Sequence, residues 1–227
     1  MKIAKIAFNK LKWLLLAFLL FYLDNALQVW FILGKNLSKT GTSLTATLVF
    51  LLATLLLFLL FKFLREPLSI KSLTSTKFAW YLLALPAVFI TNVIGSLVQQ
   101  LLTHSSASAN QNALMNLGMP FYLAIAFLVI FAPVTEELIF RKCLLEKVFG
   151  FEGYWKWIGW LVTAVLFAAI HLIRDPANIG GWITYGGMGL VFGFVAMQSK
   201  RVEYSIAIHM FMNAYATFIM ILMTLGQ

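Results

Sequence analysis

The sequence predicts an all-α fold, a polytopic bundle of about seven transmembrane helices, with eight as the alternative. Hydrophobic residues make up 62% of the 227 residues and charged residues only 11%. Soluble domains are about 45–50% apolar and about 25% charged, so this composition excludes an ordinary soluble globule and a disordered chain. Long stretches without Asp, Glu, Lys or Arg recur, and about 20 such residues cross the bilayer core as a helix. The single cysteine, Cys143, excludes an intramolecular disulfide framework and any CxxC metal site.

Seven nearly uncharged stretches are the expected spans. The first, Trp13–Gly34, is interrupted by Asp24, Asn25 and Gln28, and we interpret it as an uncleaved span because no small-residue cleavage site follows the basic N-terminus. The others are Thr40–Phe61, the two halves of Phe78–Thr135 around a polar break at Thr103–Asn116, Trp157–Ile173, Pro176–Ser199 and Tyr204–Gln227. No long linker and no internal repeat separates them, so residues 1–227 are expected to form a single membrane domain.

The distribution of positive charge predicts the orientation. The chain has 17 Lys and Arg residues and a formal net charge of +9. With the N-terminus in the cytoplasm, all of these cations except Lys35, Lys39 and Arg174 fall on the cytoplasmic side, which is a strong positive-inside bias. The basic character therefore predicts a multi-pass protein of a cell membrane with a cytoplasmic N-terminus, and it does not indicate a nucleic-acid partner.

Ionisable residues at membrane depth are the candidate functional residues, because a charge inside the bilayer is costly. Most of them fall in three short patterns: Glu136-Glu137-Leu-Ile-Phe-Arg141, Phe167-Ala-Ala-Ile-His171 and His209-Met-Phe-Met-Asn213. Glu137 and Arg141 are four residues apart and can pair on one helix face. Glu136 lies about 100° further round the helix, so its carboxylate is left for other work.

The three patterns predict activation of water in a buried, wet cavity. They reach a similar depth if the Gly- and Trp-rich stretch Gly150–Gly159 lies along the membrane interface. A carboxylate assisted by a histidine takes a proton from water. A second histidine and an asparagine amide donate hydrogen bonds to the oxyanion of a tetrahedral intermediate. The expected reaction is hydrolysis of an amide bond within the membrane.

The order EExxxR, FxxxH and HxxxN on successive hydrophobic helices resembles the CPBP family of intramembrane proteases. This family includes the type II CAAX prenyl endopeptidases and the Abi proteins linked to bacteriocin immunity. The resemblance covers residues 118–215, the expected catalytic core of a CAAX-protease-like bundle; the family commonly has eight helices. It implies that Glu136 activates water with His171 as its partner, and that His209 and Asn213 form the oxyanion site. It also implies a structural pair of Glu137 with Arg141.

The resemblance implies an endopeptidase that acts on a membrane-associated or lipidated peptide. A prenylated C-terminus and a bacteriocin-like or signalling peptide are the two expected substrate classes. The family is often labelled metalloprotease, and Glu136, His171 and His209 would then hold a zinc ion with an open position. The chain has no HExxH motif. We slightly favour metal-independent glutamate catalysis without a cofactor.

Other interpretations stay open at this point. The chain would be a non-catalytic immunity or binding protein if the acidic cluster only anchors a helix end and His209 with Asn213 only joins helices. A proton-coupled transporter is a third alternative, because Glu and His in membrane helices also form relays. Outside the three patterns, we expect a structural or gating role for Asp24, a solvated His104, an unreactive Cys143 and a close helix crossing at the glycine-rich residues 185–193.

Overall fold

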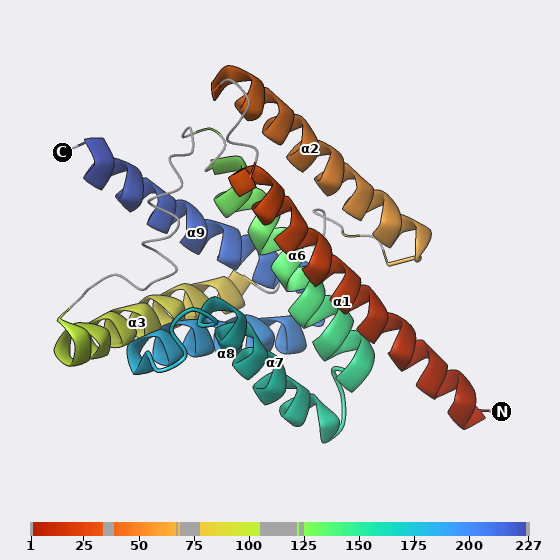
Figure 1. Ribbon diagram of the computed structural model, residues 1–227. Coiled ribbons are helices and arrows are strands. Elements are labelled where there is room, and N and C mark those ends of the chain that lie inside the picture. Colours follow the sequence, from red (N-terminus) through yellow and green to blue (C-terminus); the bar gives the residue numbers. More distant parts are fainter. Residues whose placement is uncertain are drawn as a thin grey trace.

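The computed structural model describes residues 2–33, 39–66, 78–104 and 125–225, together with Leu68 and Tyr122. These residues form helices and no strands: α1 (Lys2–Leu33), α2 (Lys39–Phe63), α3 (Phe78–Thr103), η4 (Ile125–Phe131), α6 (Ala132–Glu137), η5 (Leu138–Phe149), α7 (Trp155–His171), α8 (Ile179–Ser199) and α9 (Val202–Leu225). The segments η4, α6 and η5 follow one another without a break, so they make one continuous central helix (Figure 1). Counted this way, the described part has seven helices, and the predicted all-α fold is confirmed.

The protein is a multi-pass membrane protein by the length and composition of its helices. Within the described residues, four segments are long and apolar enough to cross a bilayer: Ala4–Asn25, Leu82–Thr103, Ile179–Ser199 and Val202–Leu222. Two further apolar helices, Leu48–Phe63 and Trp155–His171, are shorter. Large hydrophobic side chains such as Phe18, Leu55 and Leu101 are exposed on the outer helices, as expected for surfaces that contact lipid.

Two helix boundaries differ from those predicted. Helix α1 begins at Lys2 rather than Trp13, because the absence of charge marks the part of a helix inside the membrane and not the end of the helix itself. Helix α7 begins at Trp155, inside the stretch Gly150–Gly159, and the position of that stretch at the membrane interface stays a prediction. Gly159 does not break the helix; a Cβ atom there would lie 2.5 Å from Cβ of Phe149, so the glycine admits close packing against η5.

Several predicted features lie outside the described residues. They are most of the polar break Thr103–Asn116, the last residues of the first and final spans, and the cations Lys35, Lys71 and Lys77.

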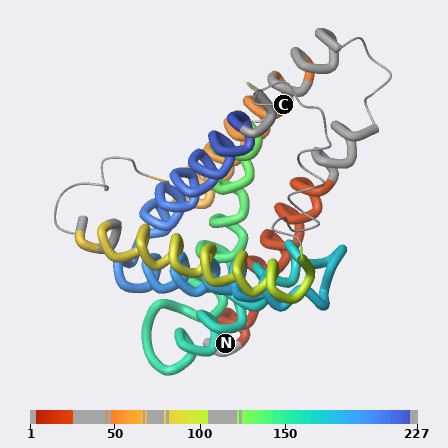
Figure 2. Tube along the Cα trace, turned by 90° about the vertical axis from the view of Figure 1, so that its left-hand side faces the viewer, coloured from red at the N-terminus to blue at the C-terminus, as the bar shows by residue number. Residues whose placement is uncertain are grey.

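Glycines bring α8 close to its two neighbours. Helices α3 and α8 lie side by side in both views (Figures 1 and 2). A Cβ atom at Gly180 would lie 2.4 Å from the backbone oxygen of Gly95 in α3. On the side facing α7, a Cβ atom at Gly189 would lie 2.9 Å from Cα of Ala164. The glycine-rich part of α8 therefore makes the close helix crossings that its spacing predicts.

The substitution Gly189→Ala is expected to destabilise the protein by about 1–3 kcal/mol. The new methyl group would meet the Cα and carbonyl oxygen of Ala164, at 2.9 and 3.0 Å, and backbone atoms cannot rotate away. Thermal unfolding of the purified protein measures the effect. Gly186→Ala is the matched control, because its nearest neighbour, Cβ of Ala168, would be 3.9 Å away. Equal losses of stability in the two variants would contradict the close crossing.

A cluster of charges around Glu66 joins α2, the central helix and α1. Oε2 of Glu66, just after α2, lies 2.9 Å from Nζ of Lys142, and Lys147 also donates to this carboxylate. Nζ of Lys147 lies 5.6 Å from the ring centroid of Trp13 in α1, and Lys200 after α8 donates to the carbonyl of Phe151 over 2.8 Å. These cations were all assigned to one side of the membrane. The structure places Lys142 and Lys147 together at Glu66; which side of the membrane faces the cytoplasm stays a prediction.

Acid is expected to weaken this cluster. Burial raises the pKa of Glu66, but the hydrogen bonds and charges of Lys147 and Lys142 more than offset it, so the pKa lies below the ordinary value of 4.5. A carboxyl whose pKa is lower in the folded state stabilises the fold above about pH 4.5 and loses that contribution as the pH falls through the folded pKa. Glu66→Gln should lower the melting temperature at about pH 6 and reduce its fall in acid.

The matched control for this prediction is Glu152→Gln. Its carboxylate lies 3.3 Å from Lys200, but the side chain is 89% exposed, and such pairs contribute little. An acid dependence unchanged by Glu66→Gln would show that the cluster does not stabilise the fold.

Candidate active site

The central helix changes its register around the candidate catalytic residues. Glu136 and Glu137 belong to the short α-helical segment α6, which lies between the π-helical segments η4 and η5. In a π register the carbonyl of Leu128 would accept from residue 133, but Pro133 has no N–H. The amide of Asn213 in α9 donates to that carbonyl instead, over 2.8 Å. Asn213 therefore fixes α9 against the irregular part of the central helix.

Glu137 connects the central helix to α9. Its Oε1 lies 3.2 Å from NH1 of Arg141, one turn further along the central helix, and both side chains are fully buried. The same oxygen lies 3.1 Å from Nδ1 of His209. The carboxylate thus pairs with one cation and also fixes the orientation of an imidazole ring.

Arg141 is enclosed by aromatic rings and one carbonyl. The centre of its guanidinium group lies 4.7 Å from the ring centroid of Phe167 and 5.5 Å from that of Phe192. NH2 donates to the carbonyl of Gly189 over 3.1 Å. A buried cation needs such partners, since its desolvation costs several kcal/mol. The geometry agrees with the structural role expected for this pair.

His171 presents an unprotonated nitrogen to Glu136. Its Nδ1 lies 2.8 Å from the carbonyl oxygen of Phe167. A carbonyl only accepts hydrogen bonds, so Nδ1 carries the hydrogen and the neutral ring has its lone pair on Nε2. That Nε2 lies 3.9 Å from Oε2 of Glu136. The ring of Tyr185 in α8 stacks on the imidazole with centroids 4.5 Å apart.

His209 is oriented in the same way from the opposite helix. The ionised Glu137 accepts the hydrogen of Nδ1, which leaves Nε2 directed toward Oε2 of Glu136 at 3.8 Å. The ring of Phe192 stacks on this imidazole at 4.7 Å. Glu136 and His171 keep 15% and 16% of their side-chain surface exposed, whereas His209 keeps 3%. The side chains of Glu136 and His171 are therefore less buried than that of His209, although Oε2 of Glu136 is itself a buried atom.

The structure therefore brings four of the predicted residues together, namely Glu136, Glu137, His171 and His209, with Arg141 behind them. Asn213 is anchored at Leu128, and its recorded hydrogen bond in the described part of the chain is not to this group. Cys143 is fully buried, and His104 is exposed as expected.

Three further residues lie near the site: Asp24, for which a structural or gating role was expected, and two aromatic residues whose contacts with the imidazoles were not predicted. Asp24 of α1 is only 7% exposed and interacts electrostatically with Glu136. Its charge at membrane depth made it a candidate in the sequence, but no motif connected it to Glu136. Tyr185 and Phe192 stack on the two imidazoles, but aromatic residues make up 15% of the chain, so no pattern distinguishes them.

The geometry does not fit a zinc ion as it stands. The described residues contain no group of three or more His, Cys, Asp or Glu side chains placed to hold a metal. The two Nε2 atoms lie 3.8 and 3.9 Å from Oε2 of Glu136. Ligand atoms about 2.0 Å from a tetrahedral zinc are only about 3.3 Å apart.

Comparison with known proteins agrees with these motifs. Residues 118–215 match the family model "Type II CAAX prenyl endopeptidase Rce1-like". The chain is 25% identical over 129 residues to UPF0177 protein YvdC of Lactococcus lactis and 26% identical over 129 residues to the putative membrane peptidase YdiL of Bacillus subtilis. It is 27% identical over 148 residues to the membrane-embedded CAAX protease MroQ of Staphylococcus aureus. The predicted resemblance is confirmed for this segment.

These matches cover part of each protein. They take in 56%, 57% and 63% of this chain and 47%, 50% and 58% of the three relatives, in the same order. The chain thus spans about half the length of the curated relatives it matches. No solved structure shows significant similarity to it.

Proposed function

We propose, from the match of residues 118–215 to the Rce1-like family, that this chain is an intramembrane endopeptidase that hydrolyses a peptide bond in a membrane-associated or lipidated peptide. The observation that carries the proposal is the arrangement around Glu136. Two imidazoles, each fixed through Nδ1, direct Nε2 to the same carboxylate oxygen. The ion pair of Glu137 with Arg141 would not need the carboxylate of Glu136 beside it if the role of this cluster were only structural.

The distances suit the activation of one water molecule. Separations of 3.8 and 3.9 Å are too long for direct hydrogen bonds. They suit a water molecule that forms one hydrogen bond to the carboxylate and one to an imidazole, each about 2.8 Å long. Glu136 takes a proton from this water while His171 accepts its other hydrogen bond. The hydroxyl oxygen then forms a bond to the carbonyl carbon of the substrate.

Collapse of the tetrahedral intermediate completes the reaction. The C–N bond breaks, and the proton held by Glu136 passes to the leaving amine, so that a carboxylic acid and an amine are released. His209 stabilises the oxyanion when Nε2 carries a proton, and the carboxylate of Glu137 keeps the ring oriented by accepting from Nδ1. Asn213 has a second amide hydrogen that serves the same oxyanion, besides the one donated to Leu128.

Two substrate classes follow from the comparisons and the motifs. The relative MroQ carries the name CAAX protease, which supports a lipidated C-terminal segment as substrate. The Abi-like motif pattern equally supports a bacteriocin-like or signalling peptide. Both classes place a flexible peptide next to a membrane anchor, where the partly exposed Glu136 and His171 can reach it.

The test uses the purified chain in lipid nanodiscs with a farnesylated peptide that ends in a CaaX sequence. The same peptide without the farnesyl group serves as a control, and products are identified by mass spectrometry. We expect cleavage by the native chain and none by Glu136→Gln. Binding of the peptide without cleavage by the native chain would contradict the proposal and favour a non-catalytic binding protein.

Removal of metal is expected to leave the activity within about twofold of the untreated rate, because Glu136 activates water without a Lewis acid. The measurement is the cleavage rate after incubation with 1,10-phenanthroline or EDTA. A non-chelating phenanthroline isomer controls for binding of the aromatic compound itself. A loss of activity that added zinc restores would overturn the metal-free mechanism and would favour zinc held by Glu136, His171 and His209.

A further inference from the structure

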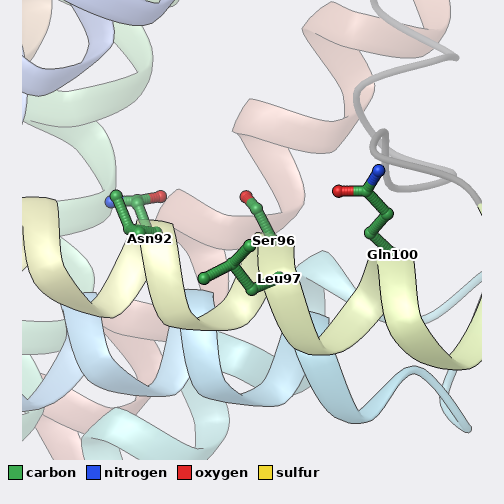
Figure 3. Close-up of a pocket in the computed structure, with 5 residues that line it drawn as sticks. Asn92, Ser96, Leu97 and Gln100 are labelled. Carbon is green, nitrogen blue, oxygen red and sulfur yellow. The ribbon is translucent and has the colours of Figure 1, made fainter.

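Three polar side chains form a stripe along one face of α3. Asn92, Ser96 and Gln100 follow one another at intervals of four residues, and together with Val93 and Leu97 they line a groove of about 260 Å³. Figure 3 shows the three polar side chains on the same side of the helix, directed away from α8. We refer to Asn92, Ser96 and Gln100 as the α3 stripe.

The stripe lies where polar groups are expensive. Asn92 is near the middle of the span Leu82–Thr103, and its neighbours Ile90 and Val93 are exposed apolar residues. The helix also has a buried amide, Gln99, which accepts a hydrogen bond from Asn178 over 3.3 Å and so has a structural partner. Ser96 and Gln100 are exposed and have no recorded hydrogen bond within the described part of the chain. Asn92 donates to the carbonyl of Val88 over 2.9 Å, so Ser96 and Gln100 are the two members of the stripe that indicate a polar occupant of the groove.

The near end of the stripe lies beside the candidate active site. Thr91, next to Asn92, lies against Gly187 of α8, where an added Cβ atom would be 2.6 Å from its side chain. Gly187 is two residues from Tyr185, whose ring stacks on His171. On the other side, the rings of Phe89 and Tyr215 are 6.4 Å apart, and Tyr215 is two residues from Asn213 in α9. The stripe thus lies on a helix that packs against α8 and α9, the helices that carry Tyr185 and His209.

The spacing of the stripe matches that of an extended peptide. Residues four apart on a helix are separated by about 6 Å along the helix axis. Alternate residues of an extended chain, whose backbone groups face the same way, repeat every about 6.6 Å. Asn and Gln side chains carry both donors and acceptors, and a Ser hydroxyl does the same. The stripe can therefore pair with the N–H and C=O groups of every second residue along about five residues of peptide.

We propose that the α3 stripe binds the backbone of an extended segment of the substrate peptide and leads it to Glu136. This inference rests on the proposed function and names how its substrate is held. A helical segment must unwind before one of its peptide bonds is hydrolysed. The N–H and C=O groups that this frees need hydrogen-bond partners inside a membrane. The stripe supplies those hydrogen-bond partners. Because it binds the backbone of the peptide, it tolerates different side chains in the substrate.

The experiment measures binding of the farnesylated CaaX peptide to the full chain carrying Glu136→Gln, in nanodiscs, so that cleavage does not intervene. We expect the double substitution Ser96→Ala/Gln100→Leu to weaken binding about tenfold. Gln100→Asn, which keeps the amide, should recover most of the affinity. Leu101→Ala is the matched control, since this neighbouring side chain is 78% exposed and does not line the groove.

A series of the same peptide with single N-methylated backbone amides tests the spacing. Methylation should weaken binding about tenfold at alternate positions with the native stripe, and less than about twofold in the double variant. Equal affinity of the two chains, or a methylation effect without period two, would overturn the inference. A disulfide cross-link between two Ser96→Cys chains would also overturn the inference if it left peptide binding unchanged. The stripe would then be a contact between two copies of the chain rather than a peptide site.

Measuring peptide cleavage as well as peptide binding distinguishes a failure of this inference from a failure of the proposed function. Cleavage that does not depend on the stripe overturns the inference alone. Stripe-dependent binding without cleavage supports the inference and overturns the proposed function. Absence of both binding and cleavage overturns both.

Discussion

Glu136→Gln is expected to lower the rate of peptide hydrolysis about a thousandfold, because an amide cannot take a proton from water. The fold should be retained. Oε2 of Glu136 has no hydrogen bond within the described residues, and Gln has the same shape. The measurement is the initial rate of peptide cleavage at equal concentrations of folded protein, with thermal unfolding recorded for both chains.

Glu136→Asp provides the internal control for this prediction. It keeps the basic carboxylate but moves it away from the two Nε2 atoms, so we expect an intermediate rate. A Glu136→Gln chain that cleaves as fast as the native chain would show that another group activates the water. A large loss of melting temperature in Glu136→Gln would instead assign the residue to the fold.

Arg141→Met is expected to destabilise the protein by about 3–5 kcal/mol, the second large effect. The substitution leaves the fully buried carboxylate of Glu137 without its cation. It also leaves the carbonyl of Gly189 without a donor. The double substitution Glu137→Gln/Arg141→Met removes both charges and should recover a large part of the loss. Thermal or denaturant unfolding of the three chains measures this coupling.

Lys142→Met is the matched control on the same helix. Lys142 pairs with Glu66 and Glu146 near the surface of the bundle, where its side chain is 14% exposed, so its loss should cost no more than about 1 kcal/mol. If Arg141→Met and Lys142→Met were equally stable, or if the double substitution were simply additive, the buried pair would not have the structural role described here.

The parts of the fold that depend on local pattern could be predicted from the sequence. Absence of charge located the apolar segments, and i, i+4 spacing placed Glu137 against Arg141. The same spacing put His171 one turn from the carbonyl of Phe167, which its Nδ1 contacts. Helical periodicity fixes such neighbours without any knowledge of the other helices.

Features that depend on contacts between helices could not be predicted. The link from Glu137 to His209 joins residues far apart in the chain, and the roles of Tyr185 and Phe192 exist only once their helices meet. The π-helical segments on either side of α6 have no signature in the sequence. The full length of α1 was missed because charged residues can extend a helix beyond the membrane.

The most direct test of the central claim is mass spectrometry of membrane-associated peptides from cells that carry the native chain, Glu136→Gln or Glu137→Gln at equal expression. We expect a peptide that is trimmed with the native chain and left whole with Glu136→Gln. Glu137→Gln should instead lower the amount of folded protein, in line with its buried pair. Identical peptide profiles for the native chain and Glu136→Gln, with any cellular phenotype preserved, would contradict catalysis by Glu136 and favour a binding protein.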